Sequence, residues 1–190
     1  MSNRYKIKNQ EGLYYLTLTV VGWIDIFSRK KFRDTIIESL KYCQEKKGLK
    51  VYAYVIMTNH IHLIVSADGE HDLSSVIKDF KSFTATSILK DLPNSKESRW
   101  EWLMDLFRDF AKKNKRNGIH QFWQTDNHPI EVYSTKVILQ KLEYIHNNPV
   151  RSKIVWLPQH YVYSSASNYF DEGSGVLEVC LLDEFFTFDN

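Results

Sequence analysis

Two histidines separated by one residue are the side chains in this sequence best suited to hold a metal ion. His60 and His62 stand in the segment NHIHLIV, at the start of an expected strand. Because side chains on a strand alternate between its two faces, the imidazoles point to one face and Ile61, Leu63 and Val65 to the other. Two imidazoles leave a divalent ion undersaturated, so a third protein ligand is required. An isolated His-X-His pair also arises by structural accident, so this pair needs support from elsewhere in the chain.

A helix expected over Ser134 to Asn148 carries a candidate nucleophile. Successive residues turn about 100° around a helix axis, because one turn contains about 3.6 residues. Tyr144 and Asn148 are four residues apart and therefore share a face, with Lys141 on the same side. The apolar stripe of this helix consists of Ile138, Leu142 and Ile145. Tyr144 is thus either a reactive side chain or a surface tyrosine whose ring packs on the sheet.

Asn148 is the residue expected to complete the metal site. Its amide oxygen lies one helical turn from the Tyr144 hydroxyl. Two imidazoles and one amide oxygen, with positions left open for substrate, suit Mg²⁺ or Mn²⁺ acting on a phosphodiester better than a closed structural zinc site. His146 and Asn147 are the nearest competitors for this role, but they point to other faces of the helix.

The elements that would position these residues follow from hydrophobic periodicity and turn residues. A short link between the second and third strands indicates an antiparallel hairpin. Pro149 is expected to end the last helix, because proline disfavours the helical conformation at the residue before it. The expected elements are a strand with its continuation over Leu13–Phe27, a helix from a cap at Ser28 to Gly48, strands over Val51–Met57 and Ile61–Ser66, and helices over Leu73–Ile88, Trp100–Phe110 and Ser134–Asn148.

This order of elements predicts an α+β fold of the ferredoxin-like (RRM-like) type, an antiparallel sheet with helices on one face. Residues 1–190 are expected to form a single domain, because that length fits one core. The domain would carry a helical insertion at about 93–118 and a packed C-terminal tail at about 150–190. The last strand is expected either near Phe122, where Phe122 and Trp123 would begin a short strand, or in the tail.

Composition alone places few limits on function. Hydrophobic residues make up 43% of the chain and the net charge is only +2, less basic than dedicated nucleic-acid binders often are. Cys43 and Cys180 have no metal-ligand spacing and imply no disulfide framework. The polar start of the chain has no apolar signal-peptide core, and no apolar run reaches the length of a membrane span. We therefore expect a cytoplasmic protein without membrane attachment.

Four segments of this sequence resemble those of a known family. VIMTNHIHLIV (55–65) resembles the HUH motif, two histidines around a hydrophobic residue. KLEYIHNNPVRSKIV (141–155) resembles the tyrosine helix of the single-tyrosine HUH transposases, and FWQTDNHP (122–129) and YVYSSASNY (161–169) resemble further segments of that group. The chain is most similar to the REP-associated tyrosine transposases and their IS200-type relatives, over roughly Leu13 to Tyr169.

The resemblance implies a function in DNA transposition and recombination. The metal-binding histidines of the family fall on His60 and His62, its nucleophile on Tyr144 and its polar ligand on Asn148. The implied enzyme is a single-strand endonuclease and strand transferase that uses a divalent metal ion, Mg²⁺ or Mn²⁺, and no nucleotide cofactor. Attack of the tyrosine on a DNA phosphodiester would give a 5′-phosphotyrosine. The implied substrate is single-stranded DNA with a hairpin, and the implied enzyme is a monomer or homodimer.

This sequence departs from the family pattern in two places. Thr58 stands where many relatives have proline, and residues 97–118 look like an insertion relative to compact members. Aromatic rings stack unpaired bases and basic side chains follow the phosphate backbone. The basic clusters near residues 29–33 and 112–116 are either such phosphate contacts or solvated helix ends. The candidate DNA-binding residues are Arg151, Trp123, Lys141, Arg29, Lys30, Lys112 and Lys113.

Three other interpretations remain open at this point. A non-catalytic nucleic-acid-binding module of ferredoxin-like fold would stack bases on sheet aromatics and would not need the histidines and the tyrosine in register. A metal-dependent phosphodiesterase that activates water would keep the histidines and survive Tyr144→Phe. A domesticated relative would bind and nick DNA without moving its own gene.

Overall fold

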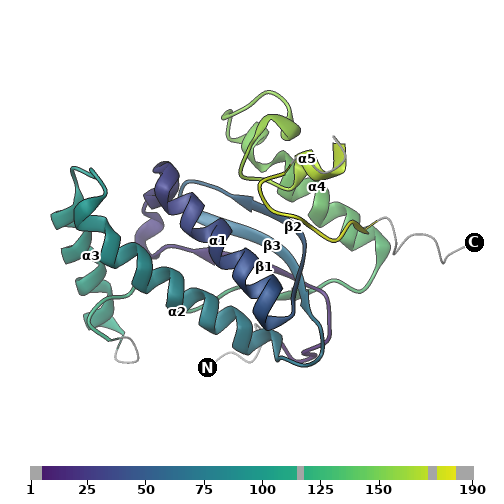
Figure 1. Cartoon of the computed structure of the whole chain (residues 1–190), viewed down its shortest axis with the longest axis horizontal. Helices are drawn as coiled ribbons and strands as arrows, with labels where there is room; N and C mark the ends of the chain where they lie inside the picture. Colours follow the sequence, from purple (N-terminus) through teal and green to yellow (C-terminus); the bar gives the residue numbers. More distant parts are fainter. Residues whose placement is uncertain (1–5, 115–117, 171–174, 183–190) are drawn as a thin grey trace, which may run out of the picture.

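The computed structural model describes residues 6–114, 118–170 and 175–182 of the chain. A four-stranded antiparallel sheet with strand order β2-β3-β1-β4 forms its centre (Figure 1). The strands are β1 (Tyr14–Thr19), β2 (Leu49–Ile56), β3 (His60–Ala67) and β4 (Ile130–Glu131). The α-helices are α1 (Lys30–Lys47), α2 (Leu73–Asp91), α3 (Trp100–Lys113), α4 (Thr135–Arg151) and α5 (Ala166–Phe170). This order and pairing confirm the ferredoxin-like α+β prediction.

The hairpin of β2 and β3 fixes the position of the two histidines. A tight turn joins the strands, with the Met57 N–H donating to the His60 carbonyl at 2.9 Å. Val55 pairs with His62 on one side of β3, and Thr17 of β1 pairs with it on the other. β3 is therefore a central strand, and its residues are held in register from both edges.

The two faces of β3 contact different helices. Ile61, Leu63 and Val65 are fully buried on the face covered by α1 and α2, which lie side by side across the sheet (Figure 1). Helix α4 packs against β2 and β3 from the opposite face, where His62 contacts Tyr144. The period of two along β3 thus separates the hydrophobic core from the candidate site.

The first predicted strand is shorter than expected. β1 ends at Thr19, and the chain then forms two 3₁₀ turns, η1 (Val21–Trp23) and η2 (Ile26–Ser28). Ile26 and Phe27 are fully buried, so their apolar side chains serve the core from turns rather than from a strand. Arg29, not Ser28, occupies the N-cap of α1, and no side chain caps that helix.

The fourth strand lies at neither of the two predicted places. β4 pairs with Tyr14 and Tyr15, whereas Trp123 forms only an isolated bridge with Val20. The segment between them still follows β1, because Thr17 donates its N–H to the Asn127 carbonyl at 2.9 Å. Lys81 of α2 holds this segment, donating to the Gln124 carbonyl at 2.8 Å and to the Asn127 side chain. Burial lowers the pKa of this lysine to about 8.

Pro149 does not end α4, contrary to the sequence prediction. The helix continues to Arg151 with Pro149 inside it, and the Ser152 N–H donates to the Asn148 carbonyl at 3.0 Å. Proline deprives the helix of one backbone hydrogen bond, the one to the carbonyl four residues earlier, and only two helical residues follow it. Lys153 then adopts a left-handed conformation (φ 58°) that terminates the helix.

The C-terminal tail covers the free edge of β2. Its residues 161–165 run beside this strand, with the Ile56 N–H donating to the Tyr163 carbonyl at 2.9 Å and the Ser165 N–H to the Tyr54 carbonyl at 3.0 Å. His146 of α4 contacts the same segment, with Nε2 2.9 Å from the Ser165 hydroxyl. The tail thereby ties α4 to the sheet and shields an edge that would otherwise pair with other chains.

Other expectations concern thiols and membranes. Cys43 is buried, Cys180 is exposed, and both are free thiols, as the absence of a disulfide pattern predicted. Among the described residues, no helix combines the length and hydropathy needed to span a bilayer.

The buried His146 makes stability depend on pH. Burial lowers its pKa from 6.5 to about 4, so the unfolded chain binds a proton in this range that the folded chain does not. We expect the free energy of unfolding to fall as the pH drops from about 6.5 to about 4, because protonation then favours the unfolded state. Denaturant titrations at a series of pH values measure this loss.

A His146→Gln protein should lose less stability over the same pH range, since glutamine does not titrate. The exposed His160 serves as the control, and His160→Gln should keep the pH dependence of the parent. An unchanged pH dependence in His146→Gln would contradict the assignment to this side chain.

Candidate active site

The two histidines form a close pair on one face of β3, as the alternation of side chains predicted. Their ring centroids are 4.6 Å apart and the ring planes are inclined by 71°. His60 lies at the start of the strand and is half-buried, whereas His62 is only 4% exposed. Burial lowers the pKa of both imidazoles, that of His62 to about 3, with smaller contributions from His60 and Lys141. Both rings are therefore neutral at neutral pH, which is the form that binds metal ions.

Two hydroxyl groups from β1 hold the ring of His62. The Tyr15 hydroxyl lies 2.8 Å and the Thr17 hydroxyl 3.0 Å from Nδ1. The other ring nitrogen, Nε2, is buried and has no hydrogen-bond partner among the described residues. With the proton on Nδ1, donated to one of these hydroxyls, Nε2 keeps a free lone pair. A buried acceptor without a partner is costly, and a metal ion would supply the missing interaction.

Helix α4 brings the predicted nucleophile to this histidine. The ring of Tyr144 stands edge-on to that of His62, with centroids 5.3 Å apart. The Arg151 guanidinium carbon lies 5.4 Å from the Tyr144 ring centre, and the Lys141 ammonium lies 4.5 Å from the ring centre of Tyr15. The spacing of three and seven residues along α4 puts both cations on the side of Tyr144. The tyrosine thus stands between a neutral histidine and two positive charges, which suits an anionic substrate.

Tyr15 is a second tyrosine in this site, but its position differs from that of Tyr144. It is 5% exposed, and its ring centroid lies 6.4 Å from that of Tyr144. Burial raises the pKa of the Tyr15 hydroxyl to about 12. Its phenol is therefore held protonated against His62, while Tyr144 is half-buried and the more accessible of the two.

The residues present fit a divalent metal ion. His60 and His62 offer neutral imidazoles, one of them with an unpartnered buried nitrogen. Asn148 lies one helical turn beyond Tyr144 and is 8% exposed; its role as the third ligand stays a prediction. The two competitors are engaged elsewhere, His146 with Ser165 and Asn147 with a backbone carbonyl of its own helix.

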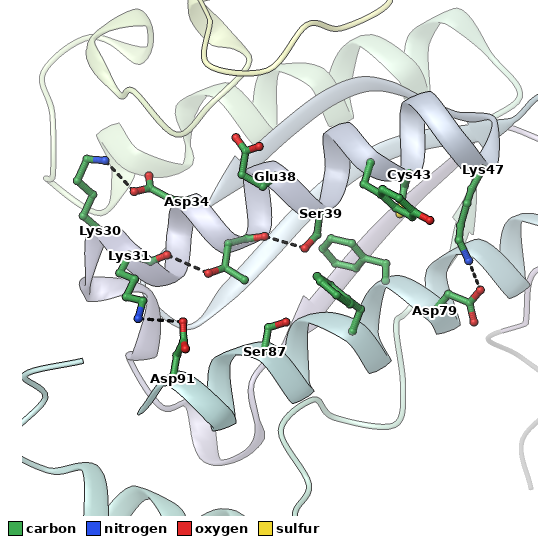
Figure 2. A pocket seen from close by; sticks show the side chains of 14 residues that line it. Lys30, Lys31, Asp34, Glu38, Ser39, Cys43, Lys47, Asp79, Ser87 and Asp91 are labelled. Carbon is green, nitrogen blue, oxygen red and sulfur yellow. Dashed lines mark hydrogen bonds and ion pairs between the residues drawn. The ribbon is translucent and has the colours of Figure 1, made fainter. Parts of the chain in front are cut away.

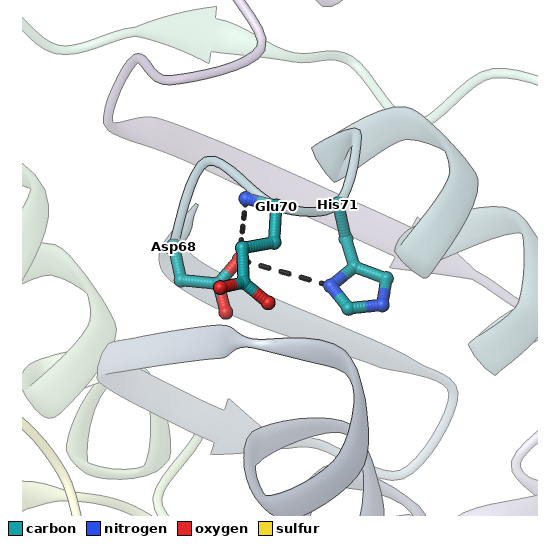
Figure 3. A group of neighbouring side chains, drawn as sticks. All are labelled: Asp68, Glu70 and His71. Carbon is teal, nitrogen blue, oxygen red and sulfur yellow. Dashed lines mark hydrogen bonds and ion pairs between the residues drawn. The ribbon is translucent and has the colours of Figure 1, made fainter.

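A second cluster of ligand-type side chains lies at the other end of β3. The ligand atoms of Asp68, Glu70 and His71 all come within 4.8 Å of one another in the loop after the strand (Figure 3). The Asp68 carboxylate accepts the Glu70 N–H at 3.0 Å, and all three side chains are exposed. This group is the acidic turn that leads into α2, and it is separate from the histidine pair.

Trp123 cannot stack an unpaired base, contrary to the sequence prediction. It is 5% exposed, and its indole N–H donates to the Thr84 hydroxyl at 3.1 Å. Its ring packs against Phe27 and Phe122 inside the core. Trp23 has the opposite environment, since it is 61% exposed and its ring lies 6.0 Å from that of His60.

The other basic candidates differ in their surroundings. Arg29 is 3.0 Å from the Glu97 carboxylate, which is 2% exposed and also accepts from Arg99. Hydrogen bonds from Arg99, then from Arg29, lower the Glu97 pKa to about 2. Arg29 therefore anchors the loop before α3. Lys112 pairs with Asp109 at 2.9 Å, and the Lys113 ammonium lies 5.5 Å from the ring centre of Phe110.

Lys30 borders a groove on the far side of the molecule. This groove, of about 1120 Å³, lies between α1 and α2 on the face away from the histidines (Figure 2). Its lysines are paired, Lys30 with Asp34 at 2.7 Å and Lys31 with Asp91 at 2.9 Å. Lys30 is thus separated from the predicted metal ligands by the sheet.

Comparison with known proteins identifies the family of this chain. Residues 14–109 match the sequence model of the IS200-like transposases. The chain belongs to the IS200-like transposase family. The matched residues include both histidines of this transposase, and α4 with Tyr144 follows them. No curated protein matched the chain.

Solved structures agree with the fold of this transposase. A REP-associated tyrosine transposase bound to a REP hairpin is 18% identical with a TM-score of 0.58, over 94% of this chain and 89% of that one. A protein of Deinococcus radiodurans R1, itself only provisionally assigned as a transposase, is 18% identical with a TM-score of 0.44, over 77% of this chain and 97% of that one. The first match shows a shared fold, and the second is too weak to support an argument.

The sequence patterns do not predict three residues of this site, namely Tyr15, Thr17 and Trp23. Tyr15 and Thr17 stand two apart on a strand that is otherwise mostly apolar, which is the one signal that was present. Their contact with His62 depends on strand pairing across 45 to 47 positions of the sequence, which no local pattern reveals.

Removing both hydroxyls at His62 should weaken metal binding. A Tyr15→Phe/Thr17→Val protein keeps the shape of the site but frees the His62 ring to take either tautomer. We expect its affinity for Mn²⁺ to fall by about 10- to 100-fold, the usual effect of losing groups that orient a metal ligand. Calorimetry or electron paramagnetic resonance measures the affinity.

Tyr14→Phe is the matched control, because Tyr14 neighbours Tyr15 on the other face of β1. It should bind Mn²⁺ as the parent does. Equal affinities in the double variant and the parent would show that these hydroxyls do not orient the metal ligand.

Proposed function

We propose that this transposase cuts and rejoins single-stranded DNA, with Tyr144 as the nucleophile and a divalent ion, Mg²⁺ or Mn²⁺, held by His60, His62 and Asn148. The observation that carries the proposal is the contact of the Tyr144 ring with His62 at 5.3 Å. A tyrosine this close to a pair of neutral imidazoles can reach a phosphate bound at the same metal. One face of the sheet carries the accessible Tyr144 phenol, the His62 Nε2 atom, which has no hydrogen-bond partner among the described residues, and the cations of Lys141 and Arg151.

The proposed reaction exchanges one phosphoester bond for another. The Tyr144 oxygen attacks phosphorus and its proton passes to water, while the bond between phosphorus and the 3′ oxygen breaks. The 3′ oxygen takes up a proton, so the products are a 5′-phosphotyrosine and a free 3′-hydroxyl. A divalent ion held by His60, His62 and Asn148 would offset the negative charge that develops on the phosphate. Because the tyrosine ester keeps the energy of the bond, a second 3′-hydroxyl can rejoin the strand without a nucleotide cofactor.

Residues around Tyr144 position the phosphate rather than react with it. Arg151, next to the Tyr144 ring, would contact the DNA backbone beside the scissile bond. Lys141, over the ring of Tyr15, adds a second positive charge on the same side. Both act on phosphate and not on base edges, so they contribute to affinity and orientation without selecting a sequence.

The proposed substrate is single-stranded DNA that flanks a hairpin. The relative with a known complex is bound to a REP hairpin, and it shares the fold over nearly the whole length of both chains. Leu103 and Phe107 of α3 belong to the main hydrophobic core, and the tail pairs with the edge of β2. These contacts support one domain that binds DNA as a unit. Whether Tyr144 completes the site of its own chain or of a second copy is decided by mixing His62→Ala and Tyr144→Phe chains.

The nucleophile is tested by its covalent product. The full chain is incubated with labelled hairpin DNA carrying single-stranded flanks, in Mn²⁺, and the products are separated on a denaturing gel. We expect a protein–DNA adduct that disappears in Tyr144→Phe, in His62→Ala and in EDTA. Tyr133→Phe, which removes the hydroxyl of an 87% exposed tyrosine just before α4, should form the adduct normally.

Two outcomes would reject Tyr144 as the nucleophile. Cleavage that persists in Tyr144→Phe without an adduct would indicate a phosphodiesterase that activates water. DNA binding without cleavage in any divalent metal would favour a non-catalytic binding module.

The role of Arg151 is tested by the salt dependence of binding. Arg151→Ala should weaken binding of hairpin DNA equally for different sequences and reduce the slope of log K against log salt by about 1, the contribution of one phosphate contact. Lys136→Ala removes an exposed charge at the other end of α4 and is the control. Unchanged affinity and slope in Arg151→Ala would exclude this contact.

A further inference from the structure

Trp23 is an exposed aromatic ring beside the metal-binding pair. Its side chain is 61% exposed, and its ring stands edge-on to that of His60, with centroids 6.0 Å apart and planes inclined by 71°. Trp102 and Trp156 are also exposed, but of these three rings that of Trp23 is the one that contacts a predicted metal ligand, among the ring contacts of the described residues. A ring left in solvent next to a candidate active site is therefore a feature that a ligand would cover.

The backbone holds this ring in a defined place. Gly22 and Trp23 both adopt left-handed conformations, with φ of 64° and 55°, which a bulky residue rarely does. Asn59 fixes the turn from the other side, since its amide nitrogen donates to the Trp23 carbonyl at 3.2 Å. The side-chain oxygen of Asn59 lies 2.6 Å from His60 Nδ1. One asparagine thus couples the position of the tryptophan to that of the metal ligand.

Helix α3 packs against the turn formed by Gly22 and Trp23. Phe110 packs so closely on Gly22 that a side chain there would come within 3.0 Å of the Phe110 ring. Lys113, in the last turn of α3, lies over that ring at 5.5 Å, and Lys112 precedes it. Helix α3 therefore braces the tryptophan turn and brings the ammonium group of Lys113 near it, while Lys112 is paired with Asp109. This contact gives the insertion a role that its sequence did not reveal.

We propose that Trp23 is the stacking platform for an unpaired base of single-stranded DNA next to the scissile phosphate. The proposal rests on the proposed function of the histidine site. An indole face stacks any nucleobase, and basic side chains beside it follow the phosphates. The end of α3 would guide the strand past Trp23 toward His60. The site thereby selects unpaired over paired DNA, because a base inside a duplex cannot expose its face to the ring.

The chemistry of the turn favours a nucleic acid over a protein partner. Trp23 contacts Asn59 and His60, and Lys113 lies over the ring that supports its turn, whereas protein interfaces have apolar centres depleted of charge. It also adjoins the residues proposed to bind the scissile phosphate, so the strand that enters the site must pass near it.

The test compares tails with and without bases. The Tyr144→Phe protein, which cannot form an adduct, is titrated by fluorescence anisotropy with a DNA hairpin that carries an oligothymidine tail. A second hairpin has abasic residues in the tail, which removes the bases and keeps the phosphates. Adding Trp23→Ala should weaken binding of the thymidine tail by about tenfold and leave the abasic tail unaffected. Trp23→Phe, which keeps an aromatic face, should retain most of the affinity.

Trp102→Ala is the matched control, since this tryptophan is 57% exposed and lies near the opposite end of α3 from Phe110. It should bind both tails as its parent does. The inference is overturned if Trp23→Ala binds the thymidine tail as tightly as its parent, or if both tails lose affinity equally. It is also overturned if Trp23→Ala changes the mass of the protein in solution while DNA affinity stays constant, because Trp23 would then contact a second chain.

Adduct formation is measured separately in proteins that keep Tyr144. Tail affinity that depends on Trp23, together with no adduct under any metal, would reject the nicking proposal and support base stacking. An adduct in a Trp23→Ala protein with unchanged tail affinity would support the nicking proposal and reject base stacking by Trp23.

Discussion

The antiparallel register of β1 on β3 is the constraint on which the candidate site depends. Thr17 lies opposite His62, so its hydroxyl and that of Tyr15, two residues along the same face, both reach His62 Nδ1. A slip of one residue would turn the histidines toward α1 and α2 and leave their nitrogens in an apolar core. The fully buried Leu63 and its neighbours prevent that slip, because burying them requires this register. Core packing and the chemistry of the site are therefore fixed by the same pairing.

The second half of the site depends on how α4 is held against the sheet. The tail, paired with the edge of β2, contacts this helix through the Ser165 hydroxyl, which lies 2.9 Å from His146 Nε2. The helix then presents Tyr144 to His62, with Lys141 and Arg151 beside it. The strand contributes neutral imidazoles to the site, and the helix contributes its positive charges. The strand can accept a metal ion without a competing proton, while the cations of the helix would attract the phosphate in the proposed reaction.

Residues 97–113 contact the turn that lies beside the candidate site. The buried Glu97 carboxylate forms ion pairs with the partly exposed Arg29 and Arg99 just before α3, and Phe110 near the end of α3 packs on Gly22. A carboxylate so well paired is costly to remove but specifies one arrangement of the loops around it. Arg29 thus stabilises the loop before α3, whereas Trp23 is exposed and is proposed to stack a base of the DNA. The insertion and the turn that it braces form one unit next to the histidines.

The sequence by itself determined the parts of the site that lie within one element. Alternation on a strand placed His60 and His62 on one face, and helical periodicity placed Lys141 beside Tyr144, because both rules act over a few residues. Only the tertiary structure decided which hydroxyls hold His62, which tryptophan is exposed and where the fourth strand pairs. The sequence favours Trp123 as a base-stacking candidate, yet Trp123 is 5% exposed and Trp23 is 61% exposed. Such differences arise from contacts between residues far apart in the chain, and the burial that they produce has no local pattern.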